Sequence, residues 1–279
     1  MGRGVKSGHR AAALAALAVI AVACAPAPVP VTVPAASALD AAHPEWPVIP
    51  FADPAYLQAR YASFEYAPGL RADLYWPPGF AFDRDLPAAF FMVGLAASSF
   101  ESNIGARATE TGLYRTLCSG AAARGMVAIV FDADVPMRDI DALLSWLRTN
   151  RRLLRLDLGR IALWARSEHA AFALLRAALP PLRRAVRGVS LVTPVLPANA
   201  SVPAPGVPVK ILEAGGELPA RTARLEAYLP GLARNGNPVV RARYEDGMHA
   251  FEMHELDEPG AVRAVEGSLD FLAAVLEGR

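Results

Sequence analysis

Five predominantly apolar segments, four of them followed by a segment of helical periodicity, constrain this chain more than any other feature. A strand that is apolar at every position is buried on both faces, as in a parallel sheet covered by helices. The amphipathic segments that follow therefore predict right-handed crossover helices on both faces of one sheet. The apolar segments are LPAAFFMVGL (86–95), MVAIVFDAD (126–134), RIALW (160–164), GVSLVTPVL (188–196) and VPVKILEAG (207–215), and the helical ones are 109–125, 138–154, 171–179 and 220–236.

A hairpin and a last strand–helix unit complete the expected sheet. RYASFEY (60–66) and LRADLYW (70–76) alternate in polarity around APGL, which is typical of two antiparallel strands. VVRARYEDG (239–247) indicates another strand, and the segment 261–278 indicates a final helix. We therefore predict an α/β fold with a mostly parallel sheet and helices on both faces.

The N-terminal segment predicts export. A basic start precedes an unbroken apolar run at 11–23, which is shorter than the about 20 residues of a membrane span and fits a signal peptide. The run ends in AVAC, where an alanine directly before Cys24 resembles the lipobox of bacterial lipoproteins, in which the cysteine carries lipid. We predict a signal peptide with a lipobox at 1–24, a Pro/Ala-rich tether at 25–54 and a folded domain at 55–279. Cleavage after Ala38 without lipid is the alternative.

The net charge and the two cysteines limit which binding partners we expect for this protein. The formal net charge is +1, so no overall field favours nucleic acid. If the protein is a cell-envelope lipoprotein, we expect it to contact the membrane only through lipid on Cys24. If it is instead periplasmic or secreted, we expect no membrane contact. The second of the two cysteines, Cys118, lies on an apolar helical stretch and is expected to be a small buried hydrophobe.

Three strand ends carry a serine, an acid and a histidine in that order. Ser167 follows the segment 160–164, Glu217 follows 207–215 and His249 follows 239–247. Parallel α/β sheets place their chemistry at the C-terminal ends of strands. A serine hydroxyl becomes a strong nucleophile when an imidazole takes its proton, and a carboxylate behind the imidazole holds the correct tautomer.

The segments around these residues resemble the dienelactone-hydrolase-like branch of the α/β-hydrolase superfamily. The resemblance rests on LYWPPG (74–79), LDLGRIALWARS (156–167), ILEAGGE (211–217) and YEDGMHAFE (244–252). It implies a Ser167–His249–Glu217 triad that hydrolyses a small-molecule ester or related acyl bond, with no cofactor and no metal. Many α/β-hydrolases carry a lid after the sixth strand, but PANASVPAPG (197–206) is too short to hold helices, so we predict no lid domain.

The serine turn departs from the G-x-S-x-G pattern of a nucleophile elbow. Ala165 and His169 occupy the two glycine positions. We expect His169 to be a helix-surface or pocket-wall residue and not a second base. The expected oxyanion donors are the backbone N–H of Glu168, after the nucleophile, and an N–H near Leu95 in the turn after FFMVG. The carboxylate of Glu168 is a concern there, because the site must stabilise negative charge.

Each residue also has a structural interpretation. Ser167 could cap the following helix, His249 could lie on the surface, and Glu213 competes with Glu217 for the role of acid. Asp132 and Asp134 could cap the next helix, and no histidine pair or calcium-loop pattern accompanies them. Together these interpretations define the alternative function, a non-catalytic binding or envelope protein on a hydrolase scaffold.

Overall fold

The computed structural model describes residues 49–278. The predicted signal peptide, Cys24 and residues 25–48 of the predicted tether lie outside the described residues. Ile49 is fully buried and its N–H donates a hydrogen bond to Thr116 Oγ1 (3.1 Å). Phe51 is also buried, and its ring lies against Gly120. Ile49 and Phe51, which lie in the segment predicted as the tether, thus pack onto the folded domain.

Residues 49–278 contain one eight-stranded sheet with the order β1-β2-β4-β3-β5-β6-β7-β8. β2 is antiparallel to both of its neighbours, and the strands from β4 to β8 pair in parallel. This confirms the predicted mostly parallel sheet with an antiparallel start. The strands are β1 (Arg60–Ala67), β2 (Leu70–Trp76), β3 (Leu86–Met92), β4 (Val127–Phe131), β5 (Leu156–Arg166), β6 (Val186–Val192), β7 (Val209–Ala214) and β8 (Val239–Tyr244).

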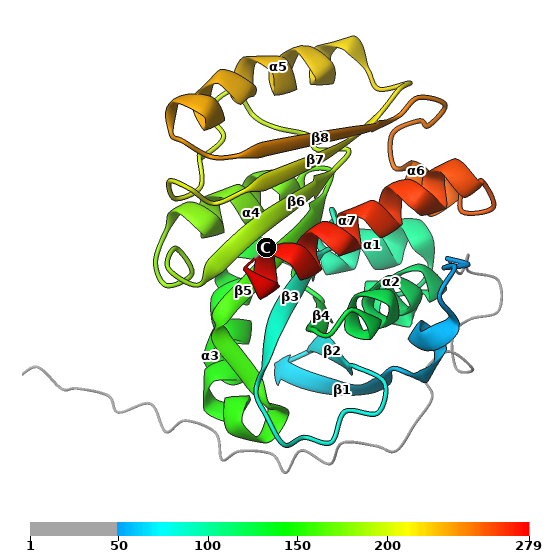
Figure 1. Cartoon of the computed structure of the whole chain (residues 1–279), viewed down its shortest axis with the longest axis vertical. Coiled ribbons are helices and arrows are strands. Elements are labelled where there is room, and N and C mark those ends of the chain that lie inside the picture. The colour runs from blue at the N-terminus through cyan, green and yellow to red at the C-terminus, as the bar shows by residue number, and fades with distance from the viewer. Residues whose placement is uncertain (1–48, 279) are drawn as a thin grey trace, which may run out of the picture. The chain divides into compact units, whose positions relative to one another are not determined.

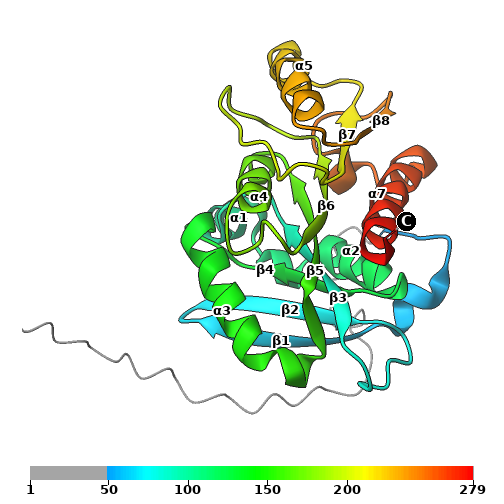
Figure 2. The same ribbon diagram turned by 60° about the vertical axis from the view of Figure 1, so that its left-hand side comes forward.

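Helices cover both faces of the sheet, as predicted. Figures 1 and 2 show α2 and α7 on one face, with α3 and α4 on the other. The apolar residues of α3, α4 and α5 join one core, and those of α2 and α7 join a second core. The helices are α1 (Ala97–Ile104), α2 (Gly112–Ala123), α3 (Pro136–Leu154), α4 (His169–Ala178), α5 (Pro219–Arg234), α6 (Phe251–His254) and α7 (Pro259–Glu277), with short 3₁₀ helices at Pro54–Gln58 and Ala108–Glu110.

Successive residues of the central strands face opposite cores. In β3, Phe90 packs against the core of α3 to α5, whereas Phe91 packs against the core of α2 and α7. Leu163 and Trp164 repeat this alternation in β5. Full burial of such a side chain contributes roughly 1.5–3 kcal/mol. These contacts therefore fix the strands whose C-terminal ends carry the candidate site.

Two elements differ from the sequence pattern. β5 begins at Leu156, ahead of the expected start at residue 160, and its pairing shifts register at Ile161 and Ala162. Helix α1, which follows β3, was not predicted. Its sequence ASSFESNI buries one residue, Phe100, so it has no apolar stripe from which a helix could be inferred.

The segment 193–208 connects β6 to β7 through turns and bends, and these described residues include no helix or strand. No helix within residues 49–278 has the length and apolar character needed to cross a membrane.

Candidate active site

Ser167 lies in the sharp turn between β5 and α4. Its φ of +47° is a left-handed conformation that non-glycine residues rarely adopt. Its N–H donates to Val192 O (3.1 Å) and its carbonyl accepts from Val195 N–H (3.0 Å), so the end of β6 holds the turn. No side chain caps the start of α4. Glu168, not Ser167, occupies the N-cap position, and the left-handed backbone of Ser167 is the kind of strain expected at a sharp strand-to-helix turn.

His249 reaches Ser167 from the loop after β8. Its Nε2 lies 3.1 Å from Ser167 Oγ, within hydrogen-bond distance. The next residue, Ala250, has φ of +62° and turns the chain directly into α6. The imidazole is 24% exposed, so its ring is not turned out into bulk solvent.

Glu217 lies behind the imidazole, in the loop between β7 and α5. Its Oε2 is 2.6 Å from His249 Nδ1, and its Oε1 accepts from Leu218 N–H (2.9 Å) and Arg221 Nη1 (3.1 Å). Burial alone would raise the pKa of Glu217. The hydrogen bonds from His249, Leu218 and Arg221, together with the charge of His249, lower the pKa below its usual value. The carboxylate therefore stays ionised next to the imidazole.

Two glycines hold the loops of Glu217 and His249 together. Gly215 N–H donates to Tyr244 O and Gly216 N–H donates to Gly247 O, both at 2.8 Å. A Cβ on Gly215 would lie 1.8 Å from Glu245 O, so the two backbones approach more closely than any side chain allows. The A-G-G sequence thus sets the distance between the acid and the histidine.

Glu213, the competing acid, faces away from this arrangement. Its two carboxylate oxygens accept from Nε and Nη2 of Arg241 on β8, at 2.8 and 2.9 Å. A carboxylate held bidentately by an arginine is already fully engaged. The structure therefore brings Glu217, and not Glu213, to the histidine.

The other residues considered in the sequence analysis, Asp132, Asp134 and Cys118, make structural contacts. Asp134 Oδ1 accepts from Ser98 N–H (2.9 Å) at the start of α1, not of α3, so the idea that it caps the next helix in the sequence is wrong. Asp132 is buried and pairs with Arg107 (3.3 Å). Cys118 is fully buried in α2, and burial raises the pKa of its thiol. Across residues 49–278, no three His, Cys, Asp or Glu side chains gather as metal ligands would.

Of the two expected oxyanion donors, Leu95 lies in the turn after β3 and Glu168 lies directly before α4. Neither the N–H of Leu95 nor that of Glu168 donates to another backbone or side-chain group of residues 49–278. The side chain of Glu168 is exposed to solvent. Its charge is therefore screened by water, which reduces the concern that it opposes an oxyanion.

Comparisons with known proteins place this geometry on a known scaffold. No family model and no curated protein matches the sequence. Among solved structures, the chain is similar to fungal esterases from Rhizomucor miehei (TM-score 0.60, 18% identity, 79% of this chain and 84% of that chain). It is also similar to esterase B from Lactobacillus rhamnosis (TM-score 0.60, 13% identity, 84% and 89%). A third similar structure is brefeldin A esterase, described as a bacterial homologue of human hormone-sensitive lipase (TM-score 0.57, 15% identity, 80% and 78%).

The fold is that of the α/β-hydrolases. At identities this low the likeness establishes the fold alone, so the chemistry has to be argued from the site. In this α/β-hydrolase fold, Ser167, Glu217 and His249 follow β5, β7 and β8 at one edge of the sheet.

A buried ion pair next to Ser167 was missed by sequence reasoning. Arg166 Nε lies 3.2 Å from Glu252 Oε1 of α6, and both side chains are almost completely buried. Arg166 also donates to Tyr114 Oη (3.3 Å) and contacts Met253 Sδ. The sequence contained an indication of this pair, because Arg166 directly follows the apolar run IALWA, and a charged side chain that is buried there needs a partner. The pair ties the end of β5 to the helix that follows His249.

His169 also differs from expectation. It is 5% exposed and does not lie on the helix surface, so that part of the expectation is wrong. Its Nδ1 accepts a hydrogen bond from Gly94 N–H (3.0 Å) in the turn after β3. Its ring meets Phe172 edge to face, with centroids 5.7 Å apart.

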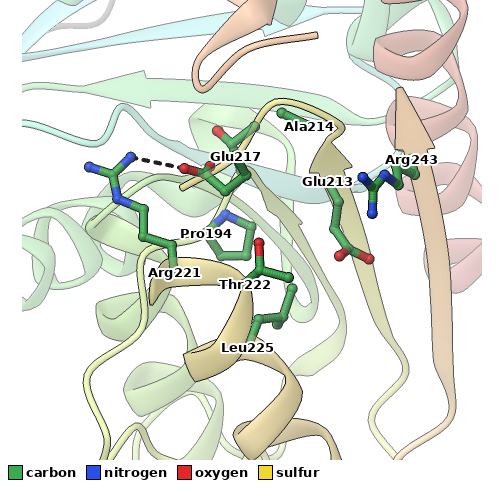
Figure 3. A pocket seen from close by; sticks show the side chains of 9 residues that line it. Pro194, Glu213, Ala214, Glu217, Arg221, Thr222, Leu225 and Arg243 are labelled. Carbon is green, nitrogen blue, oxygen red and sulfur yellow. Dashed lines mark hydrogen bonds and ion pairs between the residues drawn. The ribbon is translucent and has the colours of Figure 1, made fainter. Parts of the chain in front are cut away.

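A small pocket adjoins the acid. Figure 3 shows Arg221 of α5 reaching Glu217, with Pro194, Thr222 and Leu225 nearby. Neither Ser167 nor His249 lines this pocket. It therefore opens behind the carboxylate and is not the place where an ester carbonyl would meet the hydroxyl.

Proposed function

We propose that this protein is a serine hydrolase that cleaves an ester or a related acyl bond through an acyl-enzyme on Ser167. One observation carries the proposal: a continuous hydrogen-bond path runs from Ser167 Oγ through both ring nitrogens of His249 to Glu217 Oε2. The names of the solved structures that share the fold, several of them esterases, support an ester as the substrate class.

In the proposed first half-reaction, Ser167 Oγ attacks the ester carbonyl carbon while His249 Nε2 takes the hydroxyl proton. This requires Nε2 to be unprotonated at the start, which fits a tautomer whose Nδ1–H donates to Glu217. The ionised carboxylate then stabilises the imidazolium as it forms. His249 returns the proton to the leaving alcohol, and the acyl group stays on Ser167.

In the proposed second half-reaction, water attacks the acyl carbon with His249 again as base, and Ser167 leaves with its proton restored. Negative charge develops on the carbonyl oxygen in both halves. The N–H groups of Leu95 and Glu168 would receive it, and removal of one such donor typically costs about 10²–10³ in kcat.

We place the enzyme in the dienelactone-hydrolase-like branch, supported by the segments YEDGMHAFE and ILEAGGE. We also propose that the signal segment 1–24 directs the chain to the cell envelope, where lipid on Cys24 would anchor it. Both proposals rest on sequence segments, and the second concerns residues outside the described part of the chain.

The test uses the full-length protein, expressed in a bacterial host and extracted in mild detergent. It should hydrolyse nitrophenyl acetate or butyrate and bind a fluorophosphonate probe covalently. Ser167→Ala and His249→Ala should each lower kcat by similar factors, of order 10⁶, because triad members act as a unit. Glu217→Gln should cost less, about 10⁴-fold, because the imidazole remains in place.

Matched variants separate catalysis from surface reactivity. Ser102→Ala and His254→Ala change exposed residues, and Glu213→Gln changes the competing acid. These three should keep kcat within about threefold. Equal rates for wild type and Ser167→Ala, with no probe labelling, would overturn the proposal in favour of the non-catalytic alternative.

A further inference from the structure

The turn after β3 is held by a side chain from the helix that follows the nucleophile. His169 is the first residue of α4 and its imidazole is buried against this turn. Its Nδ1 accepts from Gly94 N–H at 3.0 Å, a contact between residues 75 positions apart. In the G-x-S-x-G pattern this position is a glycine, which has no side chain to make such a contact.

Gly94 has little room in this turn. Its φ is +92°, and a Cβ placed on it would lie 3.0 Å from Arg166 Cγ and 3.2 Å from Arg166 O. The turn is also held at its two ends. Val93 O accepts from Tyr114 Oη (3.0 Å), and Ala97 N–H donates to Ala133 O (2.9 Å). The His169 hydrogen bond holds the N–H of the same Val93–Gly94 peptide group whose carbonyl accepts from Tyr114, one peptide group before the one that carries the Leu95 N–H.

We infer that His169 is a positioning residue: its Nδ1 fixes the turn at Gly94 so that the Leu95 N–H faces the Ser167 hydroxyl as an oxyanion donor. The inference rests on the proposed function, since an oxyanion arises only if Ser167 is acylated. It assigns a role to the residue that replaces the second glycine of the elbow.

The chemistry of the ring fits this role. Nδ1 can accept a hydrogen bond only when the imidazole is neutral and its proton is on Nε2. Burial, and to a smaller extent the positive charge of Arg166, lowers the pKa of His169 to about 4. The ring is therefore neutral at physiological pH.

The decisive experiment compares His169→Leu, which removes the acceptor, with His169→Asn, whose Oδ1 can take the place of Nδ1. For nitrophenyl acetate, His169→Leu should lower kcat about 10- to 100-fold with KM within about twofold, because the donor acts in the transition state. His169→Asn should stay within about threefold of wild type. His254→Leu, the same change at an exposed histidine of α6, should leave kcat unchanged.

Hydrogen exchange gives a readout that does not depend on turnover. In a Ser167→Ala background, the amides of residues 93–97 should exchange faster in His169→Leu than with the native histidine, and His169→Asn should restore slow exchange. If His169→Leu does not fold, His169→Gly serves as the second variant without an acceptor, with folding checked by thermal melting.

The outcomes separate the two proposals. Full kcat and unchanged exchange in the acceptor-free variant would overturn the role of His169 while leaving the hydrolase proposal intact. An unreactive Ser167 in the wild type would overturn the hydrolase proposal and, with it, the oxyanion role of His169. Exchange would then report only whether His169 holds the turn.

Discussion

Replacing Gly215 with alanine is expected to lower kcat about a hundredfold in a protein that still folds. Gly215 follows β7, two residues before Glu217, and its backbone lies against the backbone of Glu245 after β8. The two loops that meet at this contact carry Glu217 and His249. A methyl group inserted there acts directly on the separation between the acid and the imidazole.

The magnitude follows from the distances. The new Cβ would lie 1.8 Å from Glu245 O, whereas Cβ contacts in proteins do not fall below 3.0 Å, so the loops must separate by about 1.2 Å. Added to the 2.6 Å between Glu217 Oε2 and His249 Nδ1, that movement gives about 3.8 Å, which is no longer a hydrogen bond. A misplacement of about 1 Å in an active site typically costs about 10² in rate.

The assay is kcat and KM for nitrophenyl butyrate, with far-UV circular dichroism to show that the variant is folded. Gly231→Ala is the matched control, because the nearest atom to a Cβ at that position in α5 is Val202 Cγ2 at 3.6 Å. The control should keep wild-type kcat. A folded Gly215→Ala variant with wild-type kcat would show that this backbone contact does not set the geometry of the acid and histidine.

Three further predictions concern single residues. Because burial lowers the pKa of His169 to about 4, the unfolded chain binds more protons than the folded one between about pH 6.5 and 4. The free energy of unfolding should therefore fall as the pH is lowered through this window, by up to about 3 kcal/mol more in wild type than in His169→Asn. Urea denaturation at about pH 7 and about pH 4.5 measures the difference. An identical pH dependence in both proteins would contradict the buried neutral ring. Glu168→Gln should change kcat less than twofold because its carboxylate is exposed, and a gain of tenfold or more would show that its charge opposes the oxyanion. Cys24→Ser should release the protein from the membrane fraction and block incorporation of labelled fatty acid; a wild type that is soluble and begins near Leu39 would instead indicate simple secretion.

The order of the strands and helices could be read from the sequence because burial on both faces leaves a local pattern. Segments such as 86–95 and 126–131 are apolar throughout, and only a strand covered by helices on both sides keeps such a run out of water. Ser167 and His249 could be placed at strand ends for the same reason. Helix α1 could not be predicted, since Phe100 alone of its residues is buried.

Which side chains meet across the sheet edge was decided by the tertiary structure. The sequence favours Glu217 over Glu213 because Glu217 follows the turn glycines. The contacts behind that choice, the approach of Gly215 to Glu245 and the bidentate pairing of Glu213 with Arg241, are tertiary. His169 has the sequence context of a helix-surface residue. It is buried because the turn at Gly94, 75 residues earlier, is brought against it by the parallel pairing of β3 with β5. Periodicity records whether a residue faces water or the core, whereas contacts between distant residues depend on strand register and loop geometry, which no local pattern encodes.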